Sequence, residues 1–136
     1  MQPYNELPRY LSMADIFVTA SLTEVHPLSV VEAMASGLPV LGIHSVGVGD
    51  TVEDGVTGLL SSPDQAAFAA QLTRLCMDRQ LRLRMGSAAR QASGKYAIER
   101  TTQIMLERYE RLLIEFAPHR RGLSFHLRNL MEKLRT

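Results

Sequence analysis

Three polar side chains interrupt an otherwise apolar segment between Pro27 and Ser36, and their spacing places them on one face of a helix. Ser29, Glu32 and Ser36 occupy positions i, i+3 and i+7, which share a face because an α-helix turns once every ~3.6 residues. A helix that is buried nearly all round, yet keeps a carboxylate on a narrow polar stripe, touches either solvent or a polar ligand there. The place of this helix in the predicted fold favours the ligand.

The elements around this helix predict an α/β unit. Residues 15–20 form a brief β-branched and aromatic run that is typical of a buried strand, and residues 40–43 form a second apolar run of strand length. Between them, Pro27 suits the first position of a helix and Gly37 its end. Strand, helix and strand in so short a segment imply parallel strands joined by a right-handed crossover. The helix therefore begins at the carboxyl end of the sheet, where α/β proteins bind ligands and where a phosphate can dock.

Turn residues and apolar periodicity divide the rest of the chain. A glycine-punctuated loop is expected over residues 44–50, and Asp54-Gly55 marks a turn before a short strand at Leu59-Leu60. Amphipathic helical segments follow from about Asp64, and a further helix is expected over residues 98–116. The fold class is thus α/β: a partial Rossmann-like parallel sheet with flanking helices and a helical carboxy-terminal region.

Residues 118–136 predict a basic amphipathic helix of their own. Pro118 is expected to end the preceding helix, because a proline lacks the N–H that a helix interior needs. Beyond it, leucines recur at spacings of four, three and four residues, with basic side chains beside them; the leucines are 123, 127, 130 and 134 and the basic residues 120, 121, 128, 133 and 135. This face predicts self-association or attachment to an anionic membrane surface.

The composition is that of one globular domain whose charge is divided between its two halves. The formal net charge is +1, but residues 1–77 carry eight acidic side chains against Arg9 and Arg74, and the remaining residues carry the excess of positive charge. That excess suits either an anionic partner or solvated helix faces. A single cysteine, Cys76, excludes an internal disulfide. The first residues lack the pattern of a secretory leader and no apolar run has membrane-spanning length, so a cytoplasmic location is expected.

Four motifs, in order, resemble one enzyme family. Residues 24–40, Glu-Val-His-Pro-Leu-Ser-Val-Val-Glu-Ala-Met-Ala-Ser-Gly-Leu-Pro-Val, carry two glutamates eight positions apart. Ala-Asp-Ile-Phe-Val precedes them at 14–18, Asp-Gly-Val-Thr-Gly-Leu-Leu follows at 54–60, and a closing helix carries Tyr109. This series resembles the carboxy-terminal nucleotide-sugar-binding domain of retaining GT-B glycosyltransferases of the family 4 type, the glycosyl transferases group 1. The resemblance implies a partial domain over residues 1–117, apparently truncated, followed by the helix at 118–136.

The resemblance implies a role for several residues of the two-glutamate motif. Glu32 matches the glutamate that holds the ribose hydroxyls of the nucleotide, and one carboxylate can accept two hydrogen bonds from a vicinal diol. Glu24 matches the glutamate beside the donor sugar, where a carboxylate stabilises the positive charge that grows as the glycosyl bond loosens. The backbone amides of Leu28 and Ser29 are expected to face the diphosphate.

Two residues inside the motif depart from the family pattern. His26 replaces a common aromatic residue, and Pro27 stands where many members have glycine, which removes one N–H from the helix start. We assign both to the nucleotide-sugar-binding loop, with a packing role for His26 favoured over that of a catalytic base. Asp50 lies where relatives often carry an acidic residue after paired glycines, but the glycines here are spaced differently.

The predicted function is therefore transfer of a hexose from a UDP- or GDP-sugar to a glycan, lipid or small-molecule acceptor, with retention of configuration and without a metal, a cofactor or nucleic acid. Two alternatives remain: another GT-B enzyme, such as a sugar-phosphate synthase or epimerase, and a non-catalytic remnant or interaction module. The family binds the donor phosphates with an Arg and a Lys on early loops, whereas the first 73 residues here hold Arg9 as their one Lys or Arg. The chain alone is therefore expected to be incomplete and inactive.

Overall fold

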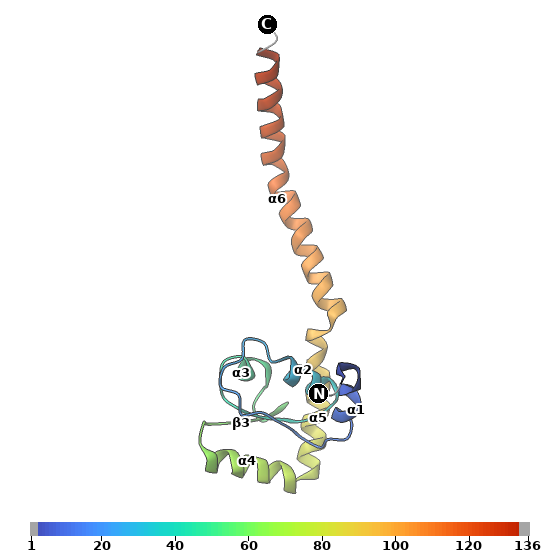
Figure 1. Cartoon of the computed structure of the whole chain (residues 1–136), viewed down its shortest axis with the longest axis vertical. Coiled ribbons are helices and arrows are strands. Elements are labelled where there is room, and N and C mark those ends of the chain that lie inside the picture. The colour runs from blue at the N-terminus through green and yellow to red at the C-terminus, as the bar shows by residue number, and fades with distance from the viewer. Residues whose placement is uncertain (1–2, 134–136) are drawn as a thin grey trace. The chain divides into compact units, whose positions relative to one another are not determined.

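The computed structural model describes the backbone of residues 3–133 and the side chains of residues 3–116. The chain forms two compact units, Met1–Tyr96 and Ala97–Thr136 (Figure 1). The first unit holds a sheet with its helices and all of the candidate site residues, and the second consists of helix α6, Ile98–Lys133. The assignment of residues 1–117 to one family domain stays a prediction.

The sheet has three parallel strands, which confirms the predicted α/β class. Strand β1 covers Phe17–Val18, β2 covers Val40–Ile43 and β3 covers Gly58–Ser61. Their order in the sheet is β1-β2-β3, and both pairs are parallel. The two strands predicted at 40–43 and 59–60 are present, because short β-branched and leucine-rich runs between turn residues suit buried strands.

The first strand is shorter and more exposed than predicted. It pairs with β2 over two residues, Phe17 with Val40 and Val18 with Leu41. At the ends of this pairing, the Phe17 N–H donates to the Pro39 carbonyl (3.0 Å) and the Thr19 N–H donates to the Leu41 carbonyl (2.9 Å). Val18 is 44% exposed. The expectation of a buried strand over residues 15–20 is therefore wrong in length and burial, because β1 lies at the edge of the described sheet and has a neighbour on one side alone.

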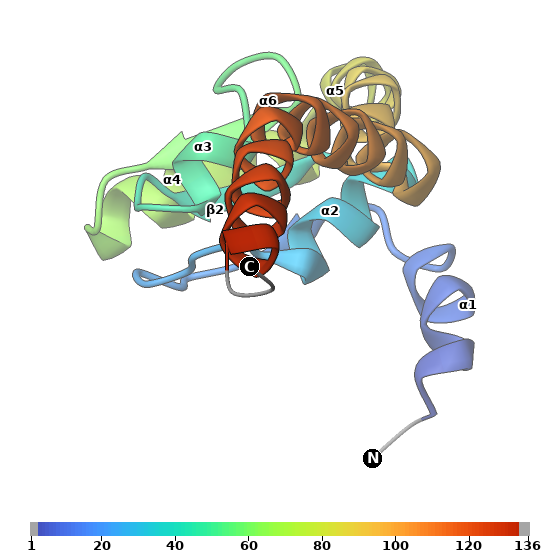
Figure 2. The ribbon, with the colours of Figure 1, turned by 90° about the horizontal axis from the view of Figure 1, so that it is seen from above.

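The first unit begins with a helical segment, and a helix is present between β1 and β2 as the sequence predicts. The 3-10 turn η1 (Tyr4–Glu6) leads into α1 (Leu7–Leu11), and α2 (Leu28–Ala35) connects β1 to β2. Figure 2 shows α1 beside α2 at the edge of the first unit. Pro27 stands just before α2 instead of at its first position, a difference of one residue that lies within the usual uncertainty of helix ends.

A short helix, α3 (Val48–Thr51), interrupts the loop that was expected over residues 44–50. Two side chains stabilise it. The Asp50 carboxylate accepts a hydrogen bond from the Gly47 N–H (3.1 Å), and the Thr51 hydroxyl donates to the Gly47 carbonyl (2.7 Å). The prediction of a loop without a helix was therefore wrong. The glycines suggested turns, but Gly47 directly precedes a helical turn whose start is capped by Asp50.

Helices α4 (Gln65–Met77) and α5 (Arg79–Ser93) confirm the predicted helical segments after Asp64. Each begins at an aspartate that accepts a hydrogen bond from a backbone N–H of the first turn: Asp64 from Ala67 and Asp78 from Leu81, both at 2.8 Å. The 3-10 turn η2 (Gly94–Tyr96) follows α5.

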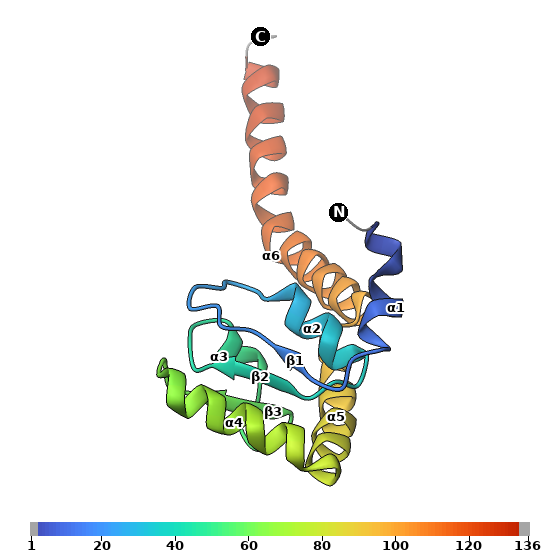
Figure 3. The same ribbon diagram turned by 60° about the horizontal axis from the view of Figure 1, so that its bottom comes forward.

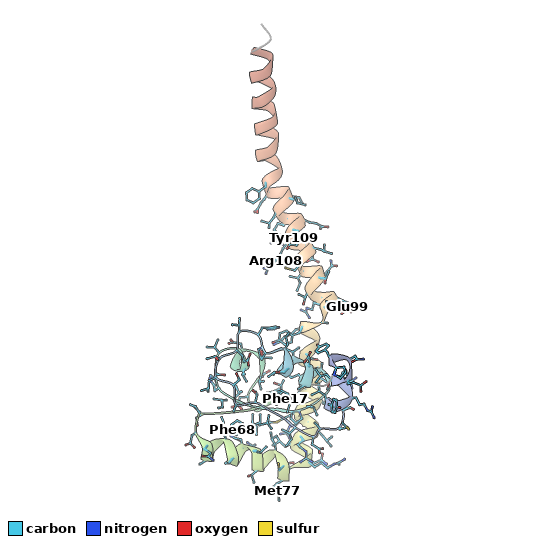
Figure 4. The ribbon with its side chains drawn as sticks, in the orientation of Figure 1. Phe17, Phe68, Met77, Glu99, Arg108 and Tyr109 are labelled. Carbon is cyan, nitrogen blue, oxygen red and sulfur yellow. The ribbon has the colours of Figure 1, made fainter. Side chains whose placement is uncertain are left out.

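Two hydrophobic clusters pack on opposite faces of the sheet. Val40 of β2 joins a cluster with α2 and α3, whereas the next residue, Leu41, joins a cluster with α4, because side chains alternate along a strand. Figure 3 shows α2 on one side of the strands and α4 on the other. Figure 4 labels Phe17, which packs on the first cluster, and Phe68 of α4, which packs on the second.

Helix α5 contributes to both clusters. Ala89 belongs to the cluster with α2, and Leu81 and Met85 belong to the cluster with α4. A close backbone contact brings α5 against the end of α2, because a Cβ atom added at Gly86 would overlap the Gly37 carbonyl oxygen. Glycine at position 86 therefore permits the approach of the two helices.

Helix α6 continues through position 118, so the predicted helix break at Pro118 is wrong (Figure 1). A proline removes one backbone hydrogen-bond donor, but its φ angle is compatible with a helix. A helix can therefore continue through a proline when the residues on both sides stay helical. The predicted stripe of Leu123, Leu127, Leu130 and Leu134 lies outside the described side chains. In the described part of the chain, no helix is long and apolar enough to span a membrane.

The Gly86 contact predicts an unusual effect of an alanine substitution. Gly86→Ala should raise helix propensity by about 1 kcal/mol, yet we expect it to lower the free energy of unfolding by roughly 1–3 kcal/mol because the new methyl group overlaps backbone. Gly94→Ala is the control, since a Cβ atom there meets nothing within 4 Å. Urea unfolding followed by circular dichroism measures both, and equal stability of the two variants would contradict the role of Gly86.

Candidate functional site

Two loops meet at the carboxyl ends of β1 and β2. Thr23 forms an isolated parallel bridge with Val46, and the Ser45 hydroxyl donates a 3.0 Å hydrogen bond to the Ser21 carbonyl. These contacts hold the segment that leaves β1 against the segment that leaves β2. The loop before α2, which carries Glu24 and His26, is thereby attached to the sheet at the edge where the sequence predicted a ligand site.

Glu24 is positioned by backbone packing and by one side-chain hydrogen bond. Gly47 has φ 82°, and a Cβ atom added there would overlap the Glu24 backbone carbonyl. The Glu24 Oε1 atom accepts a 2.8 Å hydrogen bond from the Ser21 hydroxyl. Glu24 is half-buried. The carboxyl group is thus held at the edge of the sheet through Oε1, and Oε2 has no partner among the described residues.

The start of α2 offers one free backbone donor. The Pro27 carbonyl accepts from the Val30 and Val31 N–H groups (3.0 and 3.1 Å), and the Leu28 N–H donates to the His26 carbonyl (2.9 Å). Of the two amides that the family pattern assigns to a diphosphate, Leu28 is therefore already engaged. The Ser29 N–H has no partner among the described residues, so it can donate to an anion at the positive end of the helix.

The polar face of α2 is wider than the sequence predicted. Val30, Ala33 and Met34 are its buried residues, while Leu28 is 62% exposed. The expectation of a helix buried nearly all round is therefore wrong, because α2 covers the sheet with one face and leaves the other open. Ser29 and Ser36 are exposed, and Glu32 is half-buried between them.

Glu32 has a partner that no sequence pattern indicated. The Tyr4 hydroxyl of η1 donates a hydrogen bond to Glu32 Oε1. This bond, together with the negative charge of the carboxylate, raises the pKa of Tyr4, because ionisation would remove the donor and place two negative charges side by side. Glu32 Oε2 makes no hydrogen bond with the described residues, and it remains available to a ligand.

A pocket of about 290 Å³ lies beside this hydrogen bond. Its lining includes apolar residues of α1 (Leu7, Pro8 and Leu11) and the polar side chains of Tyr4 and Glu32. Half-buried apolar walls with a few polar groups are typical of sites that bind small molecules.

The loop residue His26 contacts an aromatic residue from a distant part of the chain. The rings of His26 and Tyr96 lie 5.5 Å apart in an edge-to-face arrangement, and the Lys95 ammonium lies 4.8 Å from the centre of the Tyr96 ring. Such a contact is a packing interaction, and the cation beside it adds positive charge to the neighbourhood of the α2 start. Sequence reasoning did not find Lys95 or Tyr96, because nothing in their spacing connects them to residue 26.

Residues 1–92 match the family model described as "Glycosyl transferases group 1". The chain belongs to the group 1 glycosyltransferases. Among curated relatives of this glycosyltransferase chain, sulfoquinovosyl transferase SQD2 of Arabidopsis thaliana is 37% identical over 110 residues, which cover 77% of this chain and 22% of that protein.

Solved GT-B structures share the fold. Sucrose-phosphate synthase from Thermosynechococcus elongatus matches with a TM-score of 0.73 and 30% identity, over 78% of this chain and 27% of that one. Anabaena HepE, in a structure with UDP-glucose, matches with a TM-score of 0.70 and 26% identity, over 78% of this chain and 30% of that one. This glycosyltransferase chain thus spans between a fifth and a third of the length of these three proteins.

The close contact of Gly47 with the Glu24 backbone predicts that residue 47 cannot carry a side chain without displacing the loop before α2. Gly47→Ala and Gly55→Ala both place alanine at a positive φ, which costs roughly 1–2 kcal/mol. The two variants differ in their surroundings. A methyl group at position 47 would overlap the Glu24 backbone, whereas a Cβ atom at position 55 meets nothing within 4 Å. We expect Gly47→Ala to be less stable than Gly55→Ala by about 1–3 kcal/mol. Urea unfolding tests this, together with amide shifts at Ser21 and Thr23. Unchanged shifts in Gly47→Ala would contradict it.

Proposed function

We propose that this chain supplies the donor-binding part of a retaining glycosyltransferase that transfers a hexose from a UDP- or GDP-sugar. The observation that carries the proposal is the arrangement around the start of α2: two half-buried glutamates, each with one unengaged carboxylate oxygen, and the free Ser29 N–H. The complex of the structural relative HepE with UDP-glucose supports the choice of donor class.

Glu32 binds the ribose in this proposal. Its Oε2 atom accepts hydrogen bonds from the vicinal hydroxyls, while Oε1 stays with the Tyr4 hydroxyl. A charged acceptor strengthens such bonds, and a carboxylate held by a second partner loses less rotamer freedom on binding. The pocket between Tyr4 and α1 lies beside Glu32 and would receive the part of the nucleotide next to the ribose.

The start of α2 receives the diphosphate. The Ser29 N–H and the positive end of the helix dipole point to this role, and His26, Pro27 and Leu28 form the adjoining wall. Pro27 offers no N–H and the Leu28 N–H is engaged, so one backbone donor is available where the family pattern suggested more. The Lys95 ammonium beside Tyr96 is a second source of positive charge.

Glu24 acts on the sugar. Its carboxylate, held by Ser21, stabilises the positive charge that develops on the sugar ring as the bond to phosphate loosens. The acceptor attacks the same face that the leaving group departs from, and the leaving phosphate takes the acceptor's proton, so configuration is retained. We propose that the reaction needs no metal, that it takes place in the cytoplasm, and that the acceptor is a glycan, lipid or small molecule.

The role of Glu32 predicts a loss of nucleotide affinity. In Glu32→Ala, binding of UDP or GDP should weaken by roughly 1–3 kcal/mol, because the ribose hydroxyls lose charge-assisted hydrogen bonds. Calorimetry should also show that wild type binds a 2′,3′-dideoxy nucleotide less tightly than its parent, whereas the variant should not distinguish them.

Tyr4→Phe is the control for that experiment, since it removes the partner of Glu32 and keeps the carboxylate. We expect this variant to keep its discrimination between the two nucleotides. Loss of discrimination in Tyr4→Phe, or an unchanged affinity in Glu32→Ala, would argue that Glu32 does not bind the ribose.

Glu24→Gln should lower turnover more than donor affinity, because its charge matters most in the transition state. The measurement compares kcat with the dissociation constant of the donor, in a chimera where this chain replaces the matching segment of an active group 1 enzyme. Ser21→Ala should cause a smaller loss, since it frees the carboxylate but leaves its charge. An equal fall in affinity and turnover in Glu24→Gln would oppose a role in the transition state.

A further inference from the structure

Helix α5 presents three arginines to one pocket at the amino end of the sheet. Arg79, Arg82 and Arg90 lie at positions 0, 3 and 11 of one helical face, and all three line a pocket of about 440 Å³. The pocket is also lined by Asp15, which precedes β1, and by the turn 36–39, which precedes β2. The pocket is therefore at the other end of the strands from the Glu24 loop.

The positive charge of this pocket is not neutralised by the protein. Among the side chains of residues 3–116, the ion pair that the structure shows is Arg9 with Glu6, away from the pocket. Asp15 lines the pocket but has no ion pair with any of the three arginines. The lining of this concave site therefore holds three basic residues and one acidic residue, and such an excess of positive charge concentrates anions.

The arginines are not needed to cap the nearby end of α2. Three of the last four carbonyl groups of that helix already accept backbone hydrogen bonds: Glu32 from the Ser36 N–H (3.0 Å), Ala33 from Leu38 (3.0 Å) and Met34 from Gly37 (2.9 Å). Capping of a helix carboxyl end by basic side chains is a common structural role. Here backbone N–H groups of the turn satisfy those three carbonyls, and Arg79 and Arg90 make no hydrogen bond with the end of α2.

Arg82 is held in place before any ligand arrives, and the stem of Arg90 lies close to the turn after α2. One Nη atom of Arg82 donates to the Leu75 and Cys76 carbonyls at the end of α4 (2.8 and 2.9 Å), which leaves its other nitrogens as donors. The Arg90 side chain lies against Gly37, with its Cδ 3.9 Å from the position that a Cβ atom of residue 37 would occupy. Such prior fixation lowers the entropy lost on binding.

We propose that this pocket binds a phosphate-bearing ligand. The planar guanidinium donors match the oxygens of a phosphate monoester, and Arg is the side chain best suited to that geometry. The Ser87 hydroxyl, which also lines the pocket, adds a neutral donor without a partner among the described residues. The phosphate belongs to a small soluble ester or to a phospholipid headgroup, and the two sources are separable by experiment. This site is independent of the proposed donor site.

The test uses the whole chain, labelled with ¹⁵N and titrated with inorganic phosphate at constant ionic strength. We expect amide shifts at Ser36, Gly37 and Ser87, and a dissociation constant that rises at least about tenfold in Arg79→Gln/Arg90→Gln, because two charge-assisted contacts are lost. Arg84→Gln removes a charge from the same helix outside the pocket and should leave the affinity unchanged. Circular dichroism checks the fold, and Arg79→Gln alone replaces the double variant if the latter does not fold.

A second arm distinguishes the source of the phosphate. Glycerol 3-phosphate is the soluble ester, and phosphatidylcholine vesicles with and without phosphatidic acid represent the lipid. Tighter binding of glycerol 3-phosphate than of inorganic phosphate supports a soluble ligand, and sedimentation with phosphatidic acid that the double variant loses supports a lipid. The proposal is overturned if phosphate shifts Ser29 but not the pocket residues, if Arg84→Gln weakens binding as much as the double variant, or if neither phosphate nor vesicles bind through these arginines.

Discussion

Strand β2 must be covered on both faces, and the arrangement of the first unit follows from that constraint. It is the one described strand with a neighbour on each side, and its residues Val40 and Leu41 are fully buried in opposite clusters. Helices on both faces are the usual solution for a parallel sheet. Here α2 and α3 cover one face and α4 the other, while α5 reaches both clusters. The strand ends are consequently the open places, and both candidate sites lie there.

The two ends of the sheet differ in charge and in the way they are built. At the carboxyl end, Glu24 and Glu32 place carboxylates around the start of α2. A cation also lies near this end, because Lys95 contacts the Tyr96 ring, which packs against His26. At the amino end, α5 supplies three arginines against a single acidic residue. Charged side chains of opposite sign at the two ends of the sheet suit different ligands, because a carboxylate accepts hydrogen bonds from hydroxyl groups and a guanidinium donates them to phosphate oxygens.

Glycines at the contact points make this arrangement possible. Gly86 allows α5 to approach the end of α2, and Gly47 allows the loop after β2 to lie against the backbone of Glu24. Neither contact could accept a larger residue without displacing backbone. The candidate site therefore depends on packing between segments that are far apart in the sequence, in addition to the local motif that carries the two glutamates.

The local order of strands, turns and helix starts was determined by the sequence itself. The apolar runs at 40–43 and 59–60, the helix end at Gly37 and the helix start near Asp64 are short-range effects of side-chain type, and the structure confirms each. Only the tertiary structure decided that β1 is an exposed edge, that Tyr4 bonds to Glu32, and that Tyr96 lies against His26. Those contacts join residues separated by long stretches of chain. Periodicity and propensity report the preferences of neighbouring residues, whereas burial and long-range pairing arise from the packing of the whole unit.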